Sequence, residues 1–361
     1  MKYISLFSGI GGLESKSIEP IILCERDPQC MEFLKKKYKK AAYVKDIKDL
    51  SKKSTKIQKV DVVTGGWPCQ DLSVAGEKKG FKGVKSILFY DLLKVATKSK
   101  SESVIAENVP NLLNIDHGKV FATVLNEFAS HGYKYIAWRI INTRSFNLPH
   151  QRRRLFIVAS KSEQIAKNLF NPITNKIQKP KDNLVINGFY HSAGTHSICF
   201  CKNFTPTLKV SGGGLAIHYR NRIRKITSAE ALRLQGFNPN QFKKFSDTQI
   251  FKFAGNAVSK PVGNFIFDSI SNNIKDIVSK PITSGNLFNQ YSYTIPKNIK
   301  NGFYRNGAVY KIYLEKEHLC SNLADFIDLN NNNCLSMQAI LGLLKRAAKA
   351  NKLIKKELLT T

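Results

Sequence analysis

The sequence predicts an α/β fold, in which a doubly wound and mostly parallel sheet is joined to a smaller, irregular domain. Up to residue 160, short β-prone runs alternate with stretches of helical periodicity, which is the pattern of a parallel sheet covered by helices. From residue 161 to about residue 220 the chain is polar and irregular, with short β-prone pieces, which favours a separate small domain. A chain of 361 residues is long enough for both parts.

The first β-prone run, residues 3–7, leads at once into the glycine-rich turn Ser8-Gly9-Ile10-Gly11-Gly12. Glycines at such a place let a backbone approach a ligand, and the following helix start offers free N–H groups. The second run, residues 20–24, ends at Glu25, close to the spacing at which a dinucleotide-type fold places an acid on a ribose. Both a cofactor site and an ordinary turn remain open at this point.

A helix is expected to begin at Asp27-Pro28 and to run through Tyr38, with Asp27 as N-cap and proline at the first helical position. A third strand, residues 41–44, ends at Asp46-Ile47, where Asp46 either binds a ligand or caps the turn. The fourth strand, residues 60–63, delivers Gly65-Gly66-Trp67-Pro68-Cys69-Gln70. Cys69 thus follows a strand end, which is where catalytic residues of open α/β sheets lie.

The following elements complete the alternation. Residues 76–85 form a Gly/Lys-rich loop that is suited to act as a lid. We expect helices at 87–97 and 120–130 and strands at 103–106, 133–140 and 155–159. The strand at 103–106 leads to Glu107-Asn108, and the last strand opens with Arg152-Arg153-Arg154. Beyond the irregular part, a capping box predicts a helix over 227–235, and further helices are expected at 261–274 and 337–350.

The charge balance is strongly basic, with 57 Lys and Arg against 26 Asp and Glu and a net charge of +31. A field of that sign favours a polyanionic partner, most simply nucleic acid. A Lys-rich genome would produce the same excess, so the charge alone does not decide the partner.

No apolar run approaches the roughly 20 residues of a membrane helix, and the N-terminus lacks a signal-peptide layout. We therefore expect a cytoplasmic protein without membrane contact. The 7 cysteines are scattered and suggest reduced thiols. Cys199 and Cys201 are a close pair without a second pair or a His-x3-His nearby, so no metal site is predicted.

Several of these motifs, in this order, resemble the DNA cytosine-5 methyltransferase family of bacterial or phage type, as found in restriction-modification systems. The resemblance covers about residues 1–275 and rests on the following segments: Phe7-Ser8-Gly9-Ile10-Gly11-Gly12, Pro68-Cys69-Gln70, Glu107-Asn108-Val109, Arg152 to Arg154, Arg233-Leu234-Gln235-Gly236-Phe237 and Gly255-Asn256-Ala257-Val258. It implies a Rossmann-like catalytic and cofactor-binding domain at 1–160 and a target-recognition domain at 161–249. Residues 250–275 would return to the catalytic domain. Residues 276–361 match no core motif of the family, and we expect them to form an appended basic, helical extension that covers the catalytic domain or adds basic surface.

By this resemblance, Cys69 is the nucleophile that adds to carbon 6 of cytosine. Arg152 and Arg154 are the cations that would stabilise its thiolate. Glu107 would hydrogen-bond the N3 and N4 edge of the base and protonate N3. Asn108 and Pro68 would shape the pocket.

The same resemblance implies S-adenosyl-L-methionine as cofactor and no metal. The residues expected to bind this cofactor are Phe7, Gly9, Gly11, Gly12, Glu25, Asp46, Ile47, Pro68, Leu88, Asn256 and Val258.

The expected substrate is double-stranded DNA from which the target cytosine is flipped out. The residues expected to meet DNA are Trp67, Gln70, Ser73, Lys85, Asn108, Thr207, Leu208, Arg220, Arg222, Arg233 and Gln235. A monomer is expected, and any cognate restriction endonuclease would act separately. For Arg220 and Arg222, contact with phosphate or plain solvation is favoured over base reading.

Three positions depart from the family pattern. Trp67 stands where phenylalanine is common, His150 stands where a glutamine usually opens the arginine motif, and Lys85 stands where an arginine is often found. Two alternatives remain: an RNA cytosine methyltransferase on the same fold, and an inactive DNA-binding homologue. A cysteine hydrolase is disfavoured because no histidine lies in a matching base motif.

Overall fold

The computed structural model describes residues 1–68, 87–174, 184–190, 200–210, 214–220, 222–272, 279–281, 299–331 and 333–342. The chain divides into two compact units. The first unit comprises Met1–Ile141, Arg153–Pro172 and Val262–Lys316, and the second comprises Asn142–Arg152, Ile173–Pro261 and Glu317–Thr361.

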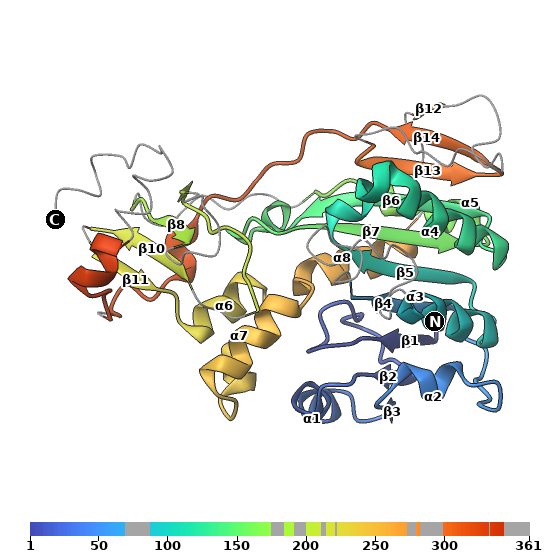
Figure 1. Cartoon of the computed structure of the whole chain (residues 1–361), viewed down its shortest axis with the longest axis horizontal. Coiled ribbons are helices and arrows are strands. Elements are labelled where there is room, and N and C mark those ends of the chain that lie inside the picture. Colours follow the sequence, from blue (N-terminus) through green and yellow to red (C-terminus); the bar gives the residue numbers. More distant parts are fainter. Residues whose placement is uncertain are drawn as a thin grey trace. The chain divides into compact units, whose positions relative to one another are not determined.

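The first unit is built on a ten-stranded sheet with the order β12-β14-β13-β6-β7-β5-β4-β1-β2-β3 (Figure 1). The pairings from β3 through β2, β1 and β4 to β5 are parallel, whereas β7 runs antiparallel to β5. The strands are β1 (Tyr3–Leu6), β2 (Ile22–Cys24), β3 (Ala42–Val44), β4 (Val62–Gly66), β5 (Ser103–Asn108), β6 (Tyr135–Asn142), β7 (Arg153–Ser160), β12 (Ser279–Pro281), β13 (Asn301–Arg305) and β14 (Ala308–Ile312). The predicted α/β sheet is confirmed.

Helices cover both faces of this sheet, as expected when successive residues of a buried strand point to opposite sides. Ile4 and Leu6 of β1 belong to a core cluster that includes residues of α3 and α4. Tyr3 lies on the other face, and its ring centroid is 4.9 Å from that of Phe267 in α8. The helices concerned are α1 (Pro28–Lys37), α2 (Ile47–Ser51), α3 (Ile87–Lys98), α4 (Lys119–Ser130), α5 (Glu163–Lys167) and α8 (Lys260–Ile270).

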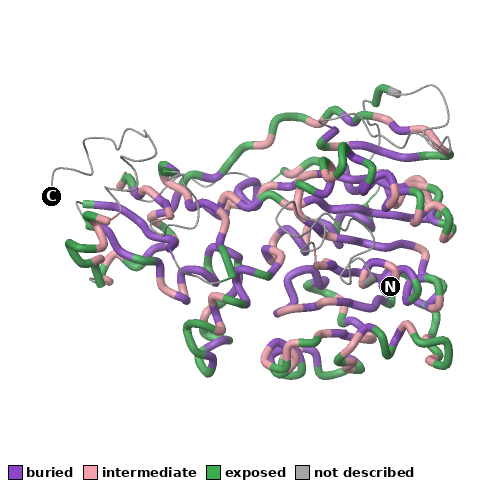
Figure 2. The backbone as a smooth tube through the Cα atoms, viewed as in Figure 1, coloured by how far each residue is buried: buried purple, intermediate pink, exposed green. Residues whose placement is uncertain are grey.

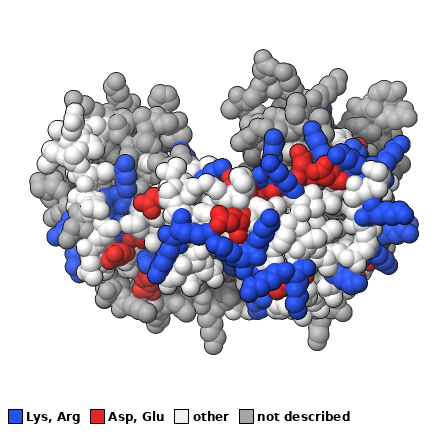
Figure 3. Space-filling model, turned by 90° about the horizontal axis from the view of Figure 1, so that it is seen from below, with Lys and Arg blue, Asp and Glu red and all other residues white. Residues whose placement is uncertain are grey.

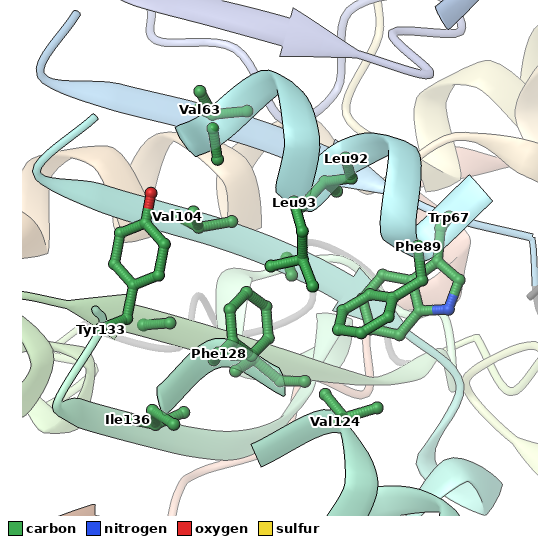
Figure 4. Close-up of a cluster of buried hydrophobic side chains, with 14 of the residues drawn as sticks. Val63, Trp67, Phe89, Leu92, Leu93, Val104, Val124, Phe128, Tyr133 and Ile136 are labelled. Atoms are coloured by element: carbon green, nitrogen blue, oxygen red, sulfur yellow. The ribbon is translucent and has the colours of Figure 1, made fainter. Parts of the chain in front are cut away.

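The centre of the core lies between α3, α4 and the middle strands (Figure 4). The Trp67 ring lies 5.1 Å from Phe89, and Phe89 makes an edge contact with Phe128 at 5.4 Å. The tube view shows the same strands as continuous buried segments (Figure 2). Because the Trp67 side chain is packed in this core, the backbone just after β4 is held in place.

Local signals set the helix starts. The Asp27 side chain accepts from the N–H groups of Gln29 and Cys30, with Pro28 at the first position, as predicted. The predicted capping box of α6 (Ser228–Leu234) is also present, since Thr227 and Glu230 bond reciprocally.

Helix α7 (Asp247–Asn256), which contains Gly255 and Asn256, is not among the helices predicted from the sequence. Its signal was present in the sequence, because Ser246 and Gln249 form a second capping box. Ile250, Phe253 and Ala254 then follow at helical spacing and are buried.

The second unit contains a four-stranded sheet with the order β11-β10-β8-β9, in which the neighbouring pairs are antiparallel. Its strands are β8 (Asn187–Tyr190), β9 (Cys201–Lys202), β10 (Leu215–Tyr219) and β11 (Arg222–Lys225). Phe189, Ala216 and Ile223 form a small core, against which Leu335 and Ile340 from the C-terminal part of the chain pack.

The C-terminal extension was predicted to be helical, but its described first part forms the strands β12, β13 and β14. The dipeptide Asn306-Gly307 joins β13 to β14 with φ of 49° and 84°, the conformation that Asn-Gly favours in tight hairpins. Strand β13 then pairs with β6, where Gly302 leaves room for the Trp138 ring. The extension therefore enlarges the sheet at its edge.

The next part of the extension, residues 317–342, belongs to the second unit. Arg224 and Glu230 form a bidentate ion pair there, with side chains that are 1% and 0% exposed. The backbone of Asp328 bonds both partners of this ion pair: its N–H donates to Glu230, and its carbonyl accepts from Arg224. Leu335 N–H donates to the Ile223 carbonyl of β11. This segment is part of the small domain's structure; residues 337–342 are helical, and the rest of the predicted helix lies outside the described residues.

Candidate functional site

The predicted catalytic residue Glu107 lies where the parallel strands β4 and β5 end. The two strands are parallel, and Gly66 at the end of β4 lies opposite Glu107 in β5. Parallel strands present their carboxyl ends at one edge of a sheet, so the segment that leads to Cys69 starts beside Glu107. Cys69 itself lies outside the described residues, as do Gln70, Ser73, Lys85 and the predicted lid.

Glu107 forms an ion pair with Arg154, with 3.1 Å between the Arg154 Nε and the Glu107 Oε1. The antiparallel pairing of β5 with β7 places them together, since Glu107 lies opposite Phe156, two residues from Arg154. Their side chains are only 15% and 18% exposed, so water screens this pair less than a surface ion pair. Arg154 thereby orients the Glu107 carboxylate.

The other carboxylate oxygen of Glu107 lies over Gly66. A Cβ built on Gly66 would be 2.7 Å from Glu107 Oε2, closer than real Cβ atoms come. Glycine at this position therefore leaves the space that the carboxylate occupies.

Asn108 fixes the backbone just before Pro68. Its Nδ2 donates to the Trp67 carbonyl at 3.2 Å, its Oδ1 accepts from Val109 N–H at 2.8 Å, and its side chain is buried. The Trp67 side chain is 3% exposed and belongs to the core. The contacts predicted for both residues with DNA stay predictions.

The turn after β1 has the backbone expected of a ligand-binding loop. Phe7, Gly9 and Gly11 have φ of 54°, 55° and 80°, and two of these three positions are glycines. The Glu25 carboxylate accepts from Gly9 N–H and from Asp27 N–H, both at 2.7 Å. Glu25 thus fastens the turn after β1 to the turn after β2.

These residues fit the cofactor that the family resemblance implies. Nothing lies within 4 Å of a Cβ built on Gly9, so a ligand can approach the backbone there. Asp46 caps α2 by accepting from Lys48 N–H at 3.0 Å. Phe7 and Leu88 are partly buried against the core, and Ile47 is buried within it.

The close approach of α8 to the glycine turn was not predicted. A Cβ built on Gly263 would lie 2.0 Å from the Gly12 carbonyl oxygen. Helix α8 therefore supports the turn through direct contact between two glycine backbones.

A Gly263→Ala variant should push α8 away from the turn. The added Cβ would clash with the Gly12 carbonyl oxygen, which is a backbone atom and cannot rotate away as a side chain could. We expect about 1–3 kcal/mol of destabilisation, as for other overpacked sites, and about tenfold weaker binding of S-adenosylmethionine. Thermal unfolding and calorimetric titration measure the two effects. Asp268→Ala on the same helix is the control, since Asp268 is exposed and pairs only at the surface with Lys16. Wild-type cofactor affinity in Gly263→Ala would contradict the supporting role.

The second unit holds the remaining predicted residues. Thr207 Oγ1 donates to the Gln151 carbonyl at 2.6 Å, and Leu208 is 3% exposed. Gln235 is buried, and its Nε2 donates to the Ala254 carbonyl at 2.6 Å, which holds α6 to α7. Arg220, Arg222, Arg233 and Asn256 are exposed, whereas Val258 is half-buried.

Arg152 lies in the second unit, whereas Arg154 lies in the first. The Arg152 side chain is 2% exposed. Burial raises the pKa of the Tyr190 hydroxyl in β8, and the positive charge of Arg152 acts in the opposite direction. The sequence grouped the two arginines, but the structure shows the Glu107 contact for Arg154.

Lysines dominate one stretch of the first unit. From residue 35 to residue 59, the acidic side chains are Asp46 and Asp49, while exposed lysines occur at 35, 36, 39, 40, 45, 48, 52, 53, 56 and 59. Figure 3 shows blue Lys and Arg side chains spread widely over the described surface of one face. Such a surface favours a polyanion.

Two absences concern the described part of the chain. It contains no group of three or more His, Cys, Asp or Glu side chains that could hold a metal ion. Among the same residues, no helix is both long and apolar enough to cross a membrane.

The sequence and the fold are both similar to those of known proteins. The family model for C-5 cytosine-specific DNA methylase matches residues 1–212 and 203–272. The Type II methyltransferase M2.BsuMI of Bacillus subtilis is 31% identical over 257 residues, which cover 66% of this chain and 65% of that protein. The Type II methyltransferase M.NgoBV of Neisseria gonorrhoeae is 28% identical over 177 residues, which cover 44% of this chain and 41% of that protein. The chain thus spans less than two thirds of the length of these relatives.

Among solved structures, the Entamoeba histolytica methyltransferase EhMeth superposes with a TM-score of 0.52 at 19% identity, covering 75% of this chain and 97% of that one. This likeness concerns the fold. Since the family model matches well over half of the sequence, the chain belongs to the C-5 cytosine-specific DNA methylase family.

Proposed function

We propose that this protein is a DNA cytosine-5 methyltransferase, which transfers the methyl group of S-adenosyl-L-methionine to carbon 5 of a cytosine in a specific duplex sequence. The observation that carries the proposal is the Glu107–Arg154 ion pair at the strand edge from which Pro68-Cys69 leaves β4. The description of the matching family, C-5 cytosine-specific DNA methylase, supports a DNA substrate. Any cognate restriction endonuclease would act separately.

The reaction needs a nucleophile because carbon 5 of cytosine attacks poorly while the ring is aromatic. The Cys69 thiolate adds to carbon 6, which breaks the aromaticity and makes carbon 5 nucleophilic. When bound, S-adenosylmethionine supplies an electrophilic methyl group. Loss of the carbon 5 proton then expels the Cys69 thiolate and restores the ring.

Glu107 contacts the N3 and N4 edge of the cytosine ring. With Oε1 paired to Arg154, we assign Oε2 to the base. It accepts a hydrogen bond from the N4 amino group and, when protonated, donates to N3 as carbon 6 is attacked. Protonation of N3 stabilises the charge that the thiolate brings into the ring.

Carbon 6 of a stacked cytosine is out of reach, so the target base must leave the duplex. The lysine-rich surface supports the non-specific part of DNA binding, because each neutralised phosphate releases counterions. We assign sequence reading to the second unit. Its exposed Arg220, Arg222 and Arg233 are suited to contact phosphate.

The test is bisulfite sequencing of plasmid DNA from cells that express the protein. We expect protected cytosines at one short recurring sequence and none in cells without the gene. Absence of protected cytosines in DNA, together with methyl transfer to tRNA in vitro, would replace the DNA substrate with RNA.

A further inference from the structure

His150 is a completely buried histidine with a defined hydrogen bond. Its Nε2 lies 3.0 Å from the backbone nitrogen of Leu208, which donates to it. A ring nitrogen that accepts carries no proton, so this contact requires the neutral ring with its proton on Nδ1. The side chain is 0% exposed, and no water competes for the bond.

We define residues 204–210 as the recognition segment. Next to the contact between His150 and Leu208, this segment forms a short ladder of backbone hydrogen bonds with residues 149–151. Thr205 N–H donates to the Pro149 carbonyl at 2.8 Å, and Gln151 N–H donates to the Thr205 carbonyl at 2.7 Å. His150 and Thr205 thereby form a parallel bridge. Beyond Thr205, side chains make the contacts: Thr207 Oγ1 donates to the Gln151 carbonyl, and His150 Nε2 accepts from Leu208 N–H.

The backbone of the recognition segment also packs closely against β8 and α7. A Cβ on Gly188 of β8 would lie 2.5 Å from the Phe204 carbonyl oxygen, and a Cβ on Gly255 of α7 would lie 2.6 Å from the backbone of Val210. The guanidinium of Arg144 lies 3.7 Å from the centre of the Phe204 ring. Both ends of the segment are therefore held by backbone contacts, and His150 holds its middle.

We propose that His150 is a positioning residue that couples the recognition segment to the backbone of Arg152. The proposal deepens the function proposed above and rests on it. Arg152 follows His150 by two residues, its N–H donates to the His150 carbonyl at 2.8 Å, and its carbonyl accepts from Thr143 N–H. In this proposal, a shift of Leu208 moves His150 and, through the His150 carbonyl, the backbone of Arg152.

The variants His150→Gln and His150→Leu separate this role from simple packing. Glutamine can place its Oε1 near the position of the histidine Nε2 and accept from Leu208 N–H, whereas leucine fills similar space without an acceptor. The rate of amide hydrogen exchange in the peptide 203–210, measured on the full-length protein, reports on the hydrogen bond between Leu208 N–H and His150. This measurement does not depend on enzymatic activity. We expect about tenfold faster exchange in His150→Leu and exchange close to wild type in His150→Gln.

The catalytic readout is the rate of methyl transfer to plasmid DNA, with kcat and KM determined separately. We expect kcat of His150→Leu to fall about tenfold, His150→Gln to stay within about threefold of wild type, and the KM for S-adenosylmethionine to be unchanged in both. Equal exchange in the two variants would overturn the positioning role. Faster exchange without any loss of kcat in His150→Leu would overturn the coupling, and an inactive wild-type protein would overturn the proposed function while the exchange experiment still decides the contact.

Discussion

A Cys69→Ser variant should form no covalent adduct with duplex DNA that carries 5-fluorocytosine at the target site, whereas the wild-type protein should be trapped. Fluorine at carbon 5 cannot leave as a proton does, so the bond between Cys69 and carbon 6 cannot be resolved after methyl transfer. Serine has nearly the same size as cysteine, but its hydroxyl is a far weaker nucleophile without an activating base. A denaturing gel with labelled DNA measures the adduct.

The other cysteines provide the control. Among the described residues, Cys24, Cys30, Cys201 and Cys320 are buried and Cys334 is exposed. Burial raises the pKa of the Cys24 thiol to about 12, which makes this neighbour of the glycine turn a poor nucleophile. Cys334→Ser should trap DNA as wild type does, and an adduct with Cys69→Ser would exclude Cys69 as the nucleophile.

The parts of the fold that sequence predicts well are those specified by neighbouring residues. Asp27-Pro28 and the capping box of Thr227 start helices where expected, because the capping groups lie within three residues of each other. The parallel strands were also predictable, since buried β-prone runs alternate with helical stretches. The Asn306-Gly307 hairpin and the capping box at Ser246 are equally local signals, although neither element was predicted.

Contacts between distant residues were less predictable. The sequence indicated that Glu107 and Arg154 were both functional, but their ion pair depends on the register of β5 against β7. The roles of Gly66 and Gly263 likewise appear only when the packed partner, Glu107 or Gly12, is known. The C-terminal segment matched no motif, and its place in the second unit depends on pairing with β11 and with the Arg224–Glu230 ion pair.

A Glu107→Gln variant should lose about 100- to 10,000-fold in kcat, the range expected for removal of a general acid. Glutamine keeps the shape of the side chain and can still bond the base, but it cannot give a proton to N3 and cannot pair with the charge of Arg154. Glutamine leaves the largely buried charge of Arg154 without its counter-charge, so we expect about 1–2 kcal/mol of lost stability. Single-turnover methylation and thermal unfolding measure the two effects, and the affinity for S-adenosylmethionine should stay unchanged.

Gly66→Ala is the matched variant, because it leaves Glu107 in the chain and moves only its carboxylate. The added Cβ would lie 2.7 Å from Oε2, the flexible end of the side chain, so the carboxylate can shift at little cost in stability. We expect kcat to fall about tenfold or more, since a displacement of the order of 1 Å is enough to impair a positioned catalytic group. Near wild-type kcat in Gly66→Ala with a large loss in Glu107→Gln would mean that only the proton matters; full activity in both would remove Glu107 from the mechanism. A loss in both variants, at unchanged stability, would show that catalysis depends on where the carboxylate lies as well as on its proton.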